Sequence, residues 1–204
     1  DGHAYVDQVQ GMGGMAVVSR GELKPGTVKV ESVEQALLDC AAWRRRGMES
    51  TVVAITGSSG KTTSRRLLMA ALERRFTVYG TGGNLNNHIG MPLVLLNAPD
   101  GDREMLVLEM GMNHPGELLV LGRVSKPDHC LITNNIWNVV LEQSSCDMSK
   151  CLIRSAQRCG VSIRDSEAVI RHSMIVDNKN GGLLLDSSRL ALSQCSLFNN
   201  GDWD

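Results

Sequence analysis

Aromatic residues are scarce in this chain of 204 residues, of which only 3% are Phe, Trp or Tyr. The core must therefore rest on Leu, Val, Ile, Met and Ala, within a hydrophobic content of 42%. No apolar run approaches the roughly 18–20 residues that a membrane-spanning helix needs. The formal net charge of -1 excludes a strong overall attraction to nucleic acid or anionic membrane. This composition is typical of a globular protein with one large domain or two small ones.

Closely spaced cysteine pairs are also missing. Without a CxxC pair, a zinc site is not expected, and reduced, buried thiols are predicted for all six cysteines: Cys40, Cys130, Cys146, Cys151, Cys159 and Cys195. The chain opens with Asp1-Gly2-His3 and shows no initiator Met, basic start or signal-like apolar stretch. We therefore expect a cytoplasmic protein that is part of something longer.

Strand-like and helix-like segments alternate over the first two thirds of the chain. Short apolar runs at 51–55, 104–108 and 130–132 are typical of buried parallel strands. A capping-box pattern at Ser32 predicts a helix through about Arg46. Two more helices are predicted, one at 61–75 and one opened by Pro115-Gly116-Glu117. The helix at 61–75 is expected to bury Leu67, Leu68, Ala71 and Leu72 on one face. This alternation predicts a parallel α/β sheet covered by helices.

The last third of the chain has a repeat of 22 residues. Val139-Val140-Leu141, Val161-Ser162-Ile163 and Leu183-Leu184-Leu185 follow one another at this step. The same step separates Met148, Ile170 and Leu192, as well as Ile153, Ile175 and Leu197. Short strands recurring at one period predict an all-β, right-handed β-solenoid similar to parallel β-helix proteins.

Two questions about this repeat stay open from sequence alone. A leucine-rich repeat is the alternative architecture, although its LxxLxLxxN spacing is absent. Asn178 and Asn200 share the period and are interpreted as an inward amide ladder, the alternative being a face that binds protein or glycan. The predicted organisation is therefore 1–50, 51–135 and 136–204, with the repeat in the last part.

The clearest chemical motif is Thr56-Gly57-Ser58-Ser59-Gly60-Lys61-Thr62-Thr63, between a predicted strand and a predicted helix. Glycines let the backbone approach phosphate oxygens, while the helix N-terminus offers N–H groups to an anion. Lys61 supplies a positive charge and Thr62 a hydroxyl for Mg²⁺. Ile55 stands where the longer phosphate-loop motif has its first glycine, so the motif is the shorter GxxGKTT form.

TGSSGKTT resembles the ATP loop of the Mur ligase family. Residues 81–93, TGGNLNNHIGMPL, and 108–117, LEMGMNHPGE, are similar to two segments of the branch of this family that adds D-alanyl-D-alanine. The resemblance extends over residues 1–134. It identifies 51–135 as part of the central ATP-binding domain and 1–50 as the rear of a domain that binds a UDP-sugar.

The resemblance implies a site for ATP and Mg²⁺. Lys61, Glu109 and His114 would be catalytic, and Thr62 and Glu109 would hold Mg²⁺. Asn86 and His88 would line the cleft, although paired asparagines are also common in loops. For His114 the alternative is a plain histidine at a helix start. The residues implied to bind ATP are Gly57, Ser58, Ser59, Gly60, Lys61, Thr62, Thr63, Asn84, Asn87 and Asn113.

The implied reaction belongs to peptidoglycan precursor synthesis. ATP would phosphorylate a UDP-N-acetylmuramoyl-peptide to an acyl phosphate, which the amine of D-alanyl-D-alanine would attack. After Asn134 the family continues with a metal-side histidine and later a carbamylated lysine, whereas this chain has Val140 at the histidine position and no matching lysine. We therefore expect a truncated homologue that does not ligate alone.

A nucleotide-binding remnant fused to a solenoid scaffold for protein or glycan is the alternative function. The repeat strands are not expected to replace the missing strands of the central sheet in register.

Overall fold

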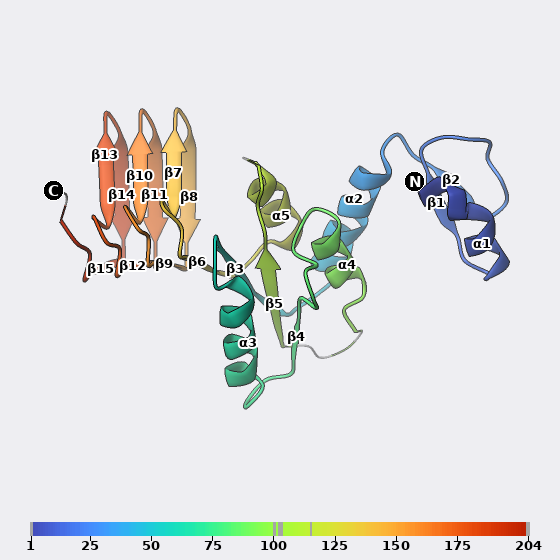
Figure 1. The fold of residues 1–204 in the computed structure, drawn as a ribbon, viewed down its shortest axis with the longest axis horizontal. Helices are drawn as coiled ribbons and strands as arrows, with labels where there is room; N and C mark the ends of the chain where they lie inside the picture. The colour runs from blue at the N-terminus through green and yellow to red at the C-terminus, as the bar shows by residue number, and fades with distance from the viewer. Residues whose placement is uncertain (1, 100, 102–103, 115, 203–204) are drawn as a thin grey trace.

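The computed structural model describes residues 2–99, 101, 104–114 and 116–202. Three parts follow one another along the long axis of the molecule, from a small N-terminal unit through an α/β part to a stack of short strands (Figure 1). The N-terminal unit contains η1 (Gly2–Tyr5), α1 (Val6–Gly11) and the parallel pair β1 (Ala16–Val18) and β2 (Thr27–Lys29).

The α/β part has the parallel sheet that the sequence predicts. Strands β4, β5, β3 and β6 lie side by side in that order, and each neighbouring pair is parallel. The three predicted strands are confirmed as β3, β5 and β6. The elements of this part are α2 (Val33–Arg46), β3 (Thr51–Gly57), α3 (Lys61–Leu72), β4 (Val78–Gly80), α4 (Gly90–Leu96), β5 (Met105–Met110), α5 (Glu117–Ser125) and β6 (His129–Thr133).

Helix α2 begins where the capping box predicts. The Ser32 hydroxyl accepts a hydrogen bond from the Gln35 amide at 3.1 Å, which satisfies one donor of the first turn. Leu38 and Ala41 are buried, and α2 packs against α4 and α5. These helices cover the core that contains Val52, Leu95, Leu106, Leu108 and Leu121.

The predicted apolar face of α3 is wrong in part. Leu67 is 68% exposed and Ala71 is also exposed, whereas Leu68 and Leu72 are half-buried and Arg65 is buried. The helix packs against β5, β3 and β4, so its orientation turns Arg65 toward the strand ends and Leu67 toward solvent. Arg65 can be buried because Glu109 at the end of β5 is its charged partner. The predicted opening of a helix at Pro115 lies outside the described residues, and α5 begins at Glu117.

The last third of the chain forms three parallel sheets that share the predicted period. Partners in neighbouring strands are 22 residues apart, as in Val139 with Val161 and Val161 with Leu183. Each repeat supplies one strand to each sheet, which differs from the single strand of a leucine-rich repeat. The strands are β7 (Val139–Glu142), β8 (Ser145–Ser149), β9 (Cys151–Arg154), β10 (Val161–Arg164), β11 (Glu167–Arg171), β12 (Met174–Val176), β13 (Leu183–Asp186), β14 (Arg189–Ser193) and β15 (Ser196–Phe198).

Sharp corners between these strands also recur every 22 residues. Each corner has one non-glycine residue in the left-handed region, with φ between 46° and 56°. Such residues are uncommon outside glycine, and Asn, Asp and His tolerate the region best. They fall in three sets: Gln143, Asp165 and Ser187; Lys150, His172 and Gln194; Ser155, Asp177 and Asn199.

In the second repeat the residue after each corner is buried, and its side chain bonds the backbone of the previous repeat. The Ser166 hydroxyl accepts from the Ser144 amide at 3.0 Å, and the Ser173 hydroxyl accepts from the Cys151 amide at 3.1 Å. At the third corner Asn178 accepts from the Ala156 amide at 2.9 Å. These contacts satisfy backbone donors that the turn removes from the strand ladder.

The repeat strands extend the central sheet, contrary to the expectation from sequence. Strand β9 pairs with β6 in parallel register, Cys130 opposite Cys151 and Thr133 opposite Arg154. The resulting sheet has seven strands in the order β15-β12-β9-β6-β3-β5-β4 (Figure 1). The pairing aligns Cys130-Leu131-Ile132 of β6 with the same tripeptide, Cys151-Leu152-Ile153, of β9.

The cysteine prediction is correct in part. All six thiols are free, and Cys151 and Cys159 are buried. Cys40 is exposed on α2, so its predicted burial is wrong. Burial and the neighbouring Asp147 carboxylate raise the pKa of the Cys146 thiol. Among the described residues no helix is both long and apolar enough to cross a membrane.

Replacing Ile153 with alanine tests the joined sheet. Ile153 on β9 is fully buried in the cluster that also receives Cys130 and Ile132 from β6. We expect Ile153→Ala to lower the free energy of unfolding by roughly 2–5 kcal/mol in chemical denaturation. Val140→Ala, at a position that is 50% exposed on β7, is the control and should change it by only about 0.5 kcal/mol. Equal small losses from both substitutions would contradict the joined core.

Candidate functional site

The predicted phosphate loop connects β3 to α3. A Cβ atom on Gly57 would lie 2.1 Å from the Thr133 carbonyl oxygen, so only glycine lets the loop pass this close to the end of β6. Gly60 has φ 76° and forms the N-cap of α3 without a side-chain hydrogen bond. The amides of the first turn therefore face the loop without a capping side chain, as anion-binding helix starts do.

Lys61 begins α3 and its side chain folds over the loop. Its Nζ donates to the Gly57 carbonyl oxygen at 2.6 Å. This contact places a positive charge directly over the turn where a phosphate would lie. Ser58, Ser59 and Gly60 are exposed, so the outer side of the loop is open to a ligand.

A buried carboxylate lies beside this loop at the end of β5. Glu109 is 2% exposed, and its Oε2 accepts from the Thr62 hydroxyl at 3.0 Å. Its Oε1 accepts from Asn86 Nδ2 at 3.0 Å, while its own amide donates to the Thr81 hydroxyl at 2.9 Å. The carboxyl ends of β3 and β5 thus bring Thr62 and Glu109 together, where parallel α/β sheets collect ligands.

Arg65 completes the surroundings of Glu109 and was missed by sequence reasoning. Its Nε lies 3.6 Å from Glu109 Oε2, and this buried nitrogen has no hydrogen-bond partner among the described residues. A buried charge needs an opposite charge nearby, and here each partner offsets the other. The sequence signal that could have found Arg65 is its spacing, because it lies four residues after Lys61, one helical turn along the same face of α3.

The oxygen atoms of Thr62 and Glu109 suit a magnesium ion. Mg²⁺ prefers hard oxygen ligands, usually one or two protein groups with water and phosphate oxygens completing its shell. The Thr62 hydroxyl and the Glu109 carboxylate lie within hydrogen-bonding distance of each other beside the phosphate loop. The donor set therefore fits Mg²⁺. The described residues include no cluster of three His, Cys, Asp or Glu side chains that would bind a metal without a nucleotide.

The asparagine segment after β4 has mainly local contacts. The Asn87 side chain accepts from the amides of Ile89 and Gly90, at 3.2 Å and 2.8 Å, and so holds the start of α4. His88 lies 3.8 Å from Glu34 on α2, whereas Asn84 is exposed. In the contacts described for Asn84, Asn86, Asn87 and His88, the side chain that reaches the Glu109 carboxylate is that of Asn86. The predicted roles of Asn84, Asn87 and His88 at a nucleotide stay predictions.

Asn113 and His114 lie in the exposed turn before α5. The Glu117 carboxylate accepts from the Asn113 amide at 2.7 Å and from the His114 amide at 3.2 Å. These backbone hydrogen bonds, with that to Asn113 foremost, lower the pKa of the Glu117 carboxyl. These hydrogen bonds hold the backbone of the turn and involve neither the Asn113 nor the His114 side chain. The predicted functions of the two residues therefore stay predictions.

The end of β6 holds the other side of the phosphate loop. Asn135 Oδ1 accepts from the Ser58 hydroxyl at 2.8 Å. Asn134 has φ 57°, and its Nδ2 lies 3.2 Å from where a Cβ atom on Gly60 would be. Neither asparagine was among the predicted site residues, because nothing in the local sequence shows that this turn returns to the loop.

Comparison with known proteins finds relatives of the part of the chain that contains this site. Residues 55–135 match the family described as the Mur ligase middle domain. The segment from β3 to β6 is thus similar to the Mur ligase middle domain, and we call it the Mur ligase part. The UDP-N-acetylmuramoyl-tripeptide–D-alanyl-D-alanine ligase of Bacillus subtilis is 39% identical over 139 residues, which cover 66% of this chain and 30% of the relative.

Solved structures of MurF ligases are also similar to this chain. The MurF ligase from Thermotoga maritima in complex with ADP is 34% identical, with a TM-score of 0.59, over 66% of this chain and 31% of that chain. MurF from Acinetobacter baumannii is 33% identical, with a TM-score of 0.59, over 64% and 29%. This chain thus spans about 30% of the length of the curated relative described above.

A paired substitution tests the buried ion pair. Arg65→Met should lower the free energy of unfolding by about 3 kcal/mol, because the Glu109 carboxylate is left without its guanidinium. Adding Glu109→Gln should recover most of this loss, since no charge then stays buried. Denaturant unfolding of the single and double variants measures both values. A double variant that is no more stable than Arg65→Met would argue against the pair.

Proposed function

We propose that the Mur ligase part of this chain binds Mg²⁺ and ATP in the loop between β3 and α3. The observation that carries the proposal is the meeting of Lys61, Thr62 and Glu109 at the ends of β3 and β5. A cation, a hydroxyl and a carboxylate beside uncapped helix amides match the needs of a triphosphate and its metal. The ADP complex of the Thermotoga maritima relative supports a nucleotide as the ligand.

Each of these residues has a separate role in the proposal. Lys61 leaves the Gly57 carbonyl and places its ammonium group against the β- and γ-phosphates. Thr62 and Glu109 hold Mg²⁺, which when bound neutralises charge on the transferred phosphoryl group. Arg65 and Asn86 keep the Glu109 carboxylate turned toward the loop through the contacts described above.

The proposed ancestral reaction is an ATP-dependent amide ligation in peptidoglycan precursor synthesis. The names of the relatives support UDP-N-acetylmuramoyl-tripeptide and D-alanyl-D-alanine as the substrates of the complete enzymes. Positioning of the two substrates and charge neutralisation would carry most of the catalysis.

For these 204 residues alone we propose nucleotide binding without ligation. The family match ends at Asn135, and the structure continues there into the repeat strands. Val140, at the position where the resemblance expects a histidine, is 50% exposed on β7.

The proposed organisation keeps the three parts predicted from sequence. In this proposal, residues 1–50 belong to a UDP-sugar-binding domain, 51–135 belong to the ATP-binding domain, and 136–204 are a short right-handed β-solenoid. The constant 22-residue register of the three sheets supports the solenoid. Contact of the repeats with a protein or glycan stays a prediction.

Titration calorimetry with ATP and Mg²⁺ tests the nucleotide site. Wild-type protein should bind, and Lys61→Ala should lose at least about tenfold in affinity because a charged contact to phosphate disappears. Lys179→Ala is the matched control, since Lys179 is exposed in the repeats and should leave the affinity unchanged. Absence of binding to the wild-type protein would refute the proposal.

A second variant tests the metal ligand. Glu109→Gln should bind ATP with the same affinity in Mg²⁺ and in EDTA, because an amide is a much weaker ligand for Mg²⁺ than a carboxylate. Wild-type protein should bind more tightly with Mg²⁺ than with EDTA. If the variant keeps the full wild-type response to Mg²⁺, Glu109 does not hold the metal.

A further inference from the structure

An unbroken row of side-chain hydrogen bonds runs from the phosphate loop to the last repeat. It begins at Ser58, whose hydroxyl donates to Asn135 Oδ1 at 2.8 Å. Asn135 Nδ2 donates in turn to Asn138 Oδ1 at 3.0 Å. The first two contacts therefore tie the exposed loop of the Mur ligase part to the turn that leads into β7.

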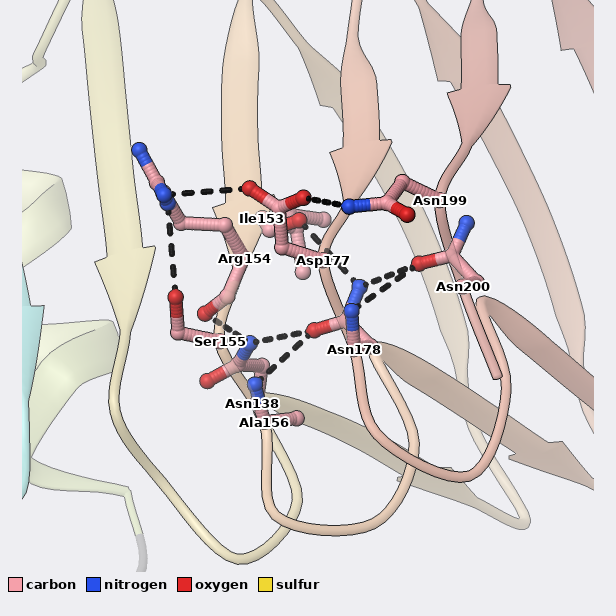
Figure 2. A network of polar contacts seen from close by, with 9 residues as sticks. All are labelled: Asn138, Ile153, Arg154, Ser155, Ala156, Asp177, Asn178, Asn199 and Asn200. Carbon is pink, nitrogen blue, oxygen red and sulfur yellow. Dashed lines mark hydrogen bonds and ion pairs between the residues drawn. The ribbon is translucent and has the colours of Figure 1, made fainter. Parts of the chain in front are cut away.

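The row continues across the repeats through the third corner (Figure 2). Asn138 Nδ2 donates to Asn178 Oδ1 at 3.2 Å, and Asn178 Nδ2 donates to Asn200 Oδ1 at 2.9 Å. Asn200 Nδ2 ends the row on the Ile175 carbonyl at 2.9 Å. We call Asn135, Asn138, Asn178 and Asn200 the asparagine relay.

The asparagine relay is partly buried, and its hydrogen bonds all run in the same donor-to-acceptor direction. Asn178 is 1% exposed, and its Oδ1 also accepts from the Ala156 amide at 2.9 Å. Each amide accepts from the preceding member and donates onward, and the bonds between the asparagines are partly shielded from solvent, so neighbouring bonds polarise and strengthen one another. Asn138 Nδ2 also donates to the Arg154 carbonyl at 2.8 Å, which anchors it to the end of β9.

The other corners are built in the same way but do not reach the loop. Ser173 is 1% exposed, and its hydroxyl accepts from the Cys151 amide and donates to the Arg171 carbonyl, at 3.1 Å and 2.7 Å. Its contacts stay within the repeats. Ser173 therefore provides a comparison for Asn178, with similar burial and a similar place in the stack.

We propose that the asparagine relay positions the phosphate loop for nucleotide binding, so that the repeat region sets the affinity of a site in the Mur ligase part. The inference rests on the nucleotide site proposed above. Ser58 is exposed in a loop with few other side-chain contacts, and holding it before the ligand arrives removes part of the ordering cost of binding. Asn135, Asn138 and Asn178 are positioning residues, because they act through Ser58.

Calorimetry of ATP and Mg²⁺ binding at 25 °C compares Asn178→Ala with Ser173→Ala. We expect both variants to lose thermal stability, because each leaves a buried backbone amide without its partner. Only Asn178→Ala should also bind nucleotide more weakly, by at least about threefold, the size of coupling that networks of this kind transmit. Asn138→Ala, at a half-buried position nearer the loop, should weaken binding at least as much and serves if Asn178→Ala does not fold.

Hydrogen exchange of the loop in the absence of nucleotide gives a second readout. The amides of residues 58–61 should exchange faster in Asn178→Ala than in wild-type protein, and at the wild-type rate in Ser173→Ala. Unchanged affinity and loop exchange in both Asn178→Ala and Asn138→Ala would overturn the inference while leaving the nucleotide site intact. Equal weakening in Ser173→Ala would show a general loss of stability and would also overturn it. If wild-type protein fails to bind, the proposed function fails and the inference with it.

Discussion

Strand β6 has a partner on each side, and the rest of the structure depends on this pairing. Its backbone bonds β3 of the Mur ligase part on one side and β9 of the first repeat on the other. A strand at the edge of a parallel sheet would expose unpaired N–H and C=O groups. Because β9 covers that edge, the α/β part and the 22-residue repeats share one sheet. The same pairing brings the turn after β6 against the phosphate loop, where Asn135 meets Ser58.

The candidate site follows from where the strands end. Parallel strands β3 and β5 end at the same edge of the sheet, so the phosphate loop after β3 lies close to Glu109 at the end of β5. There the hydroxyl of Thr62, at the start of α3, donates to the Glu109 carboxylate. Arg65 and Asn86 then make the burial of Glu109 possible by supplying a charge and a hydrogen bond. Among the described residues, the repeats reach this edge through backbone pairing and through the asparagine relay. The residues proposed to bind the nucleotide therefore lie in the Mur ligase part, and the repeats help to hold the edge on which they lie.

Much of this fold could be predicted because its signals are local or periodic. The loop motif, the cap at Ser32 and the 22-residue registers each depend on neighbouring residues or on a fixed step. Even the corners carry a periodic signal, since Gln143, Asp165 and Ser187 are each followed by serine. The burial of Arg65 could not be predicted, because it depends on Glu109 across the sheet. The β6–β9 pairing was not predicted either, although Cys-Leu-Ile recurs in both strands and pairs residue for residue, because this single recurrence falls at a step of 21 residues, outside the 22-residue period.

Amide hydrogen exchange along β6 tests the joined sheet most directly. The Cys130 amide donates to the Lys150 carbonyl at 3.2 Å, so it is an amide of β6 that faces the repeats. The account predicts that this amide exchanges only through global unfolding, as slowly as the amides of the central strand β3. Exchange as fast as at the edge strand β4 would contradict it, because the repeats would then not be held against the Mur ligase part.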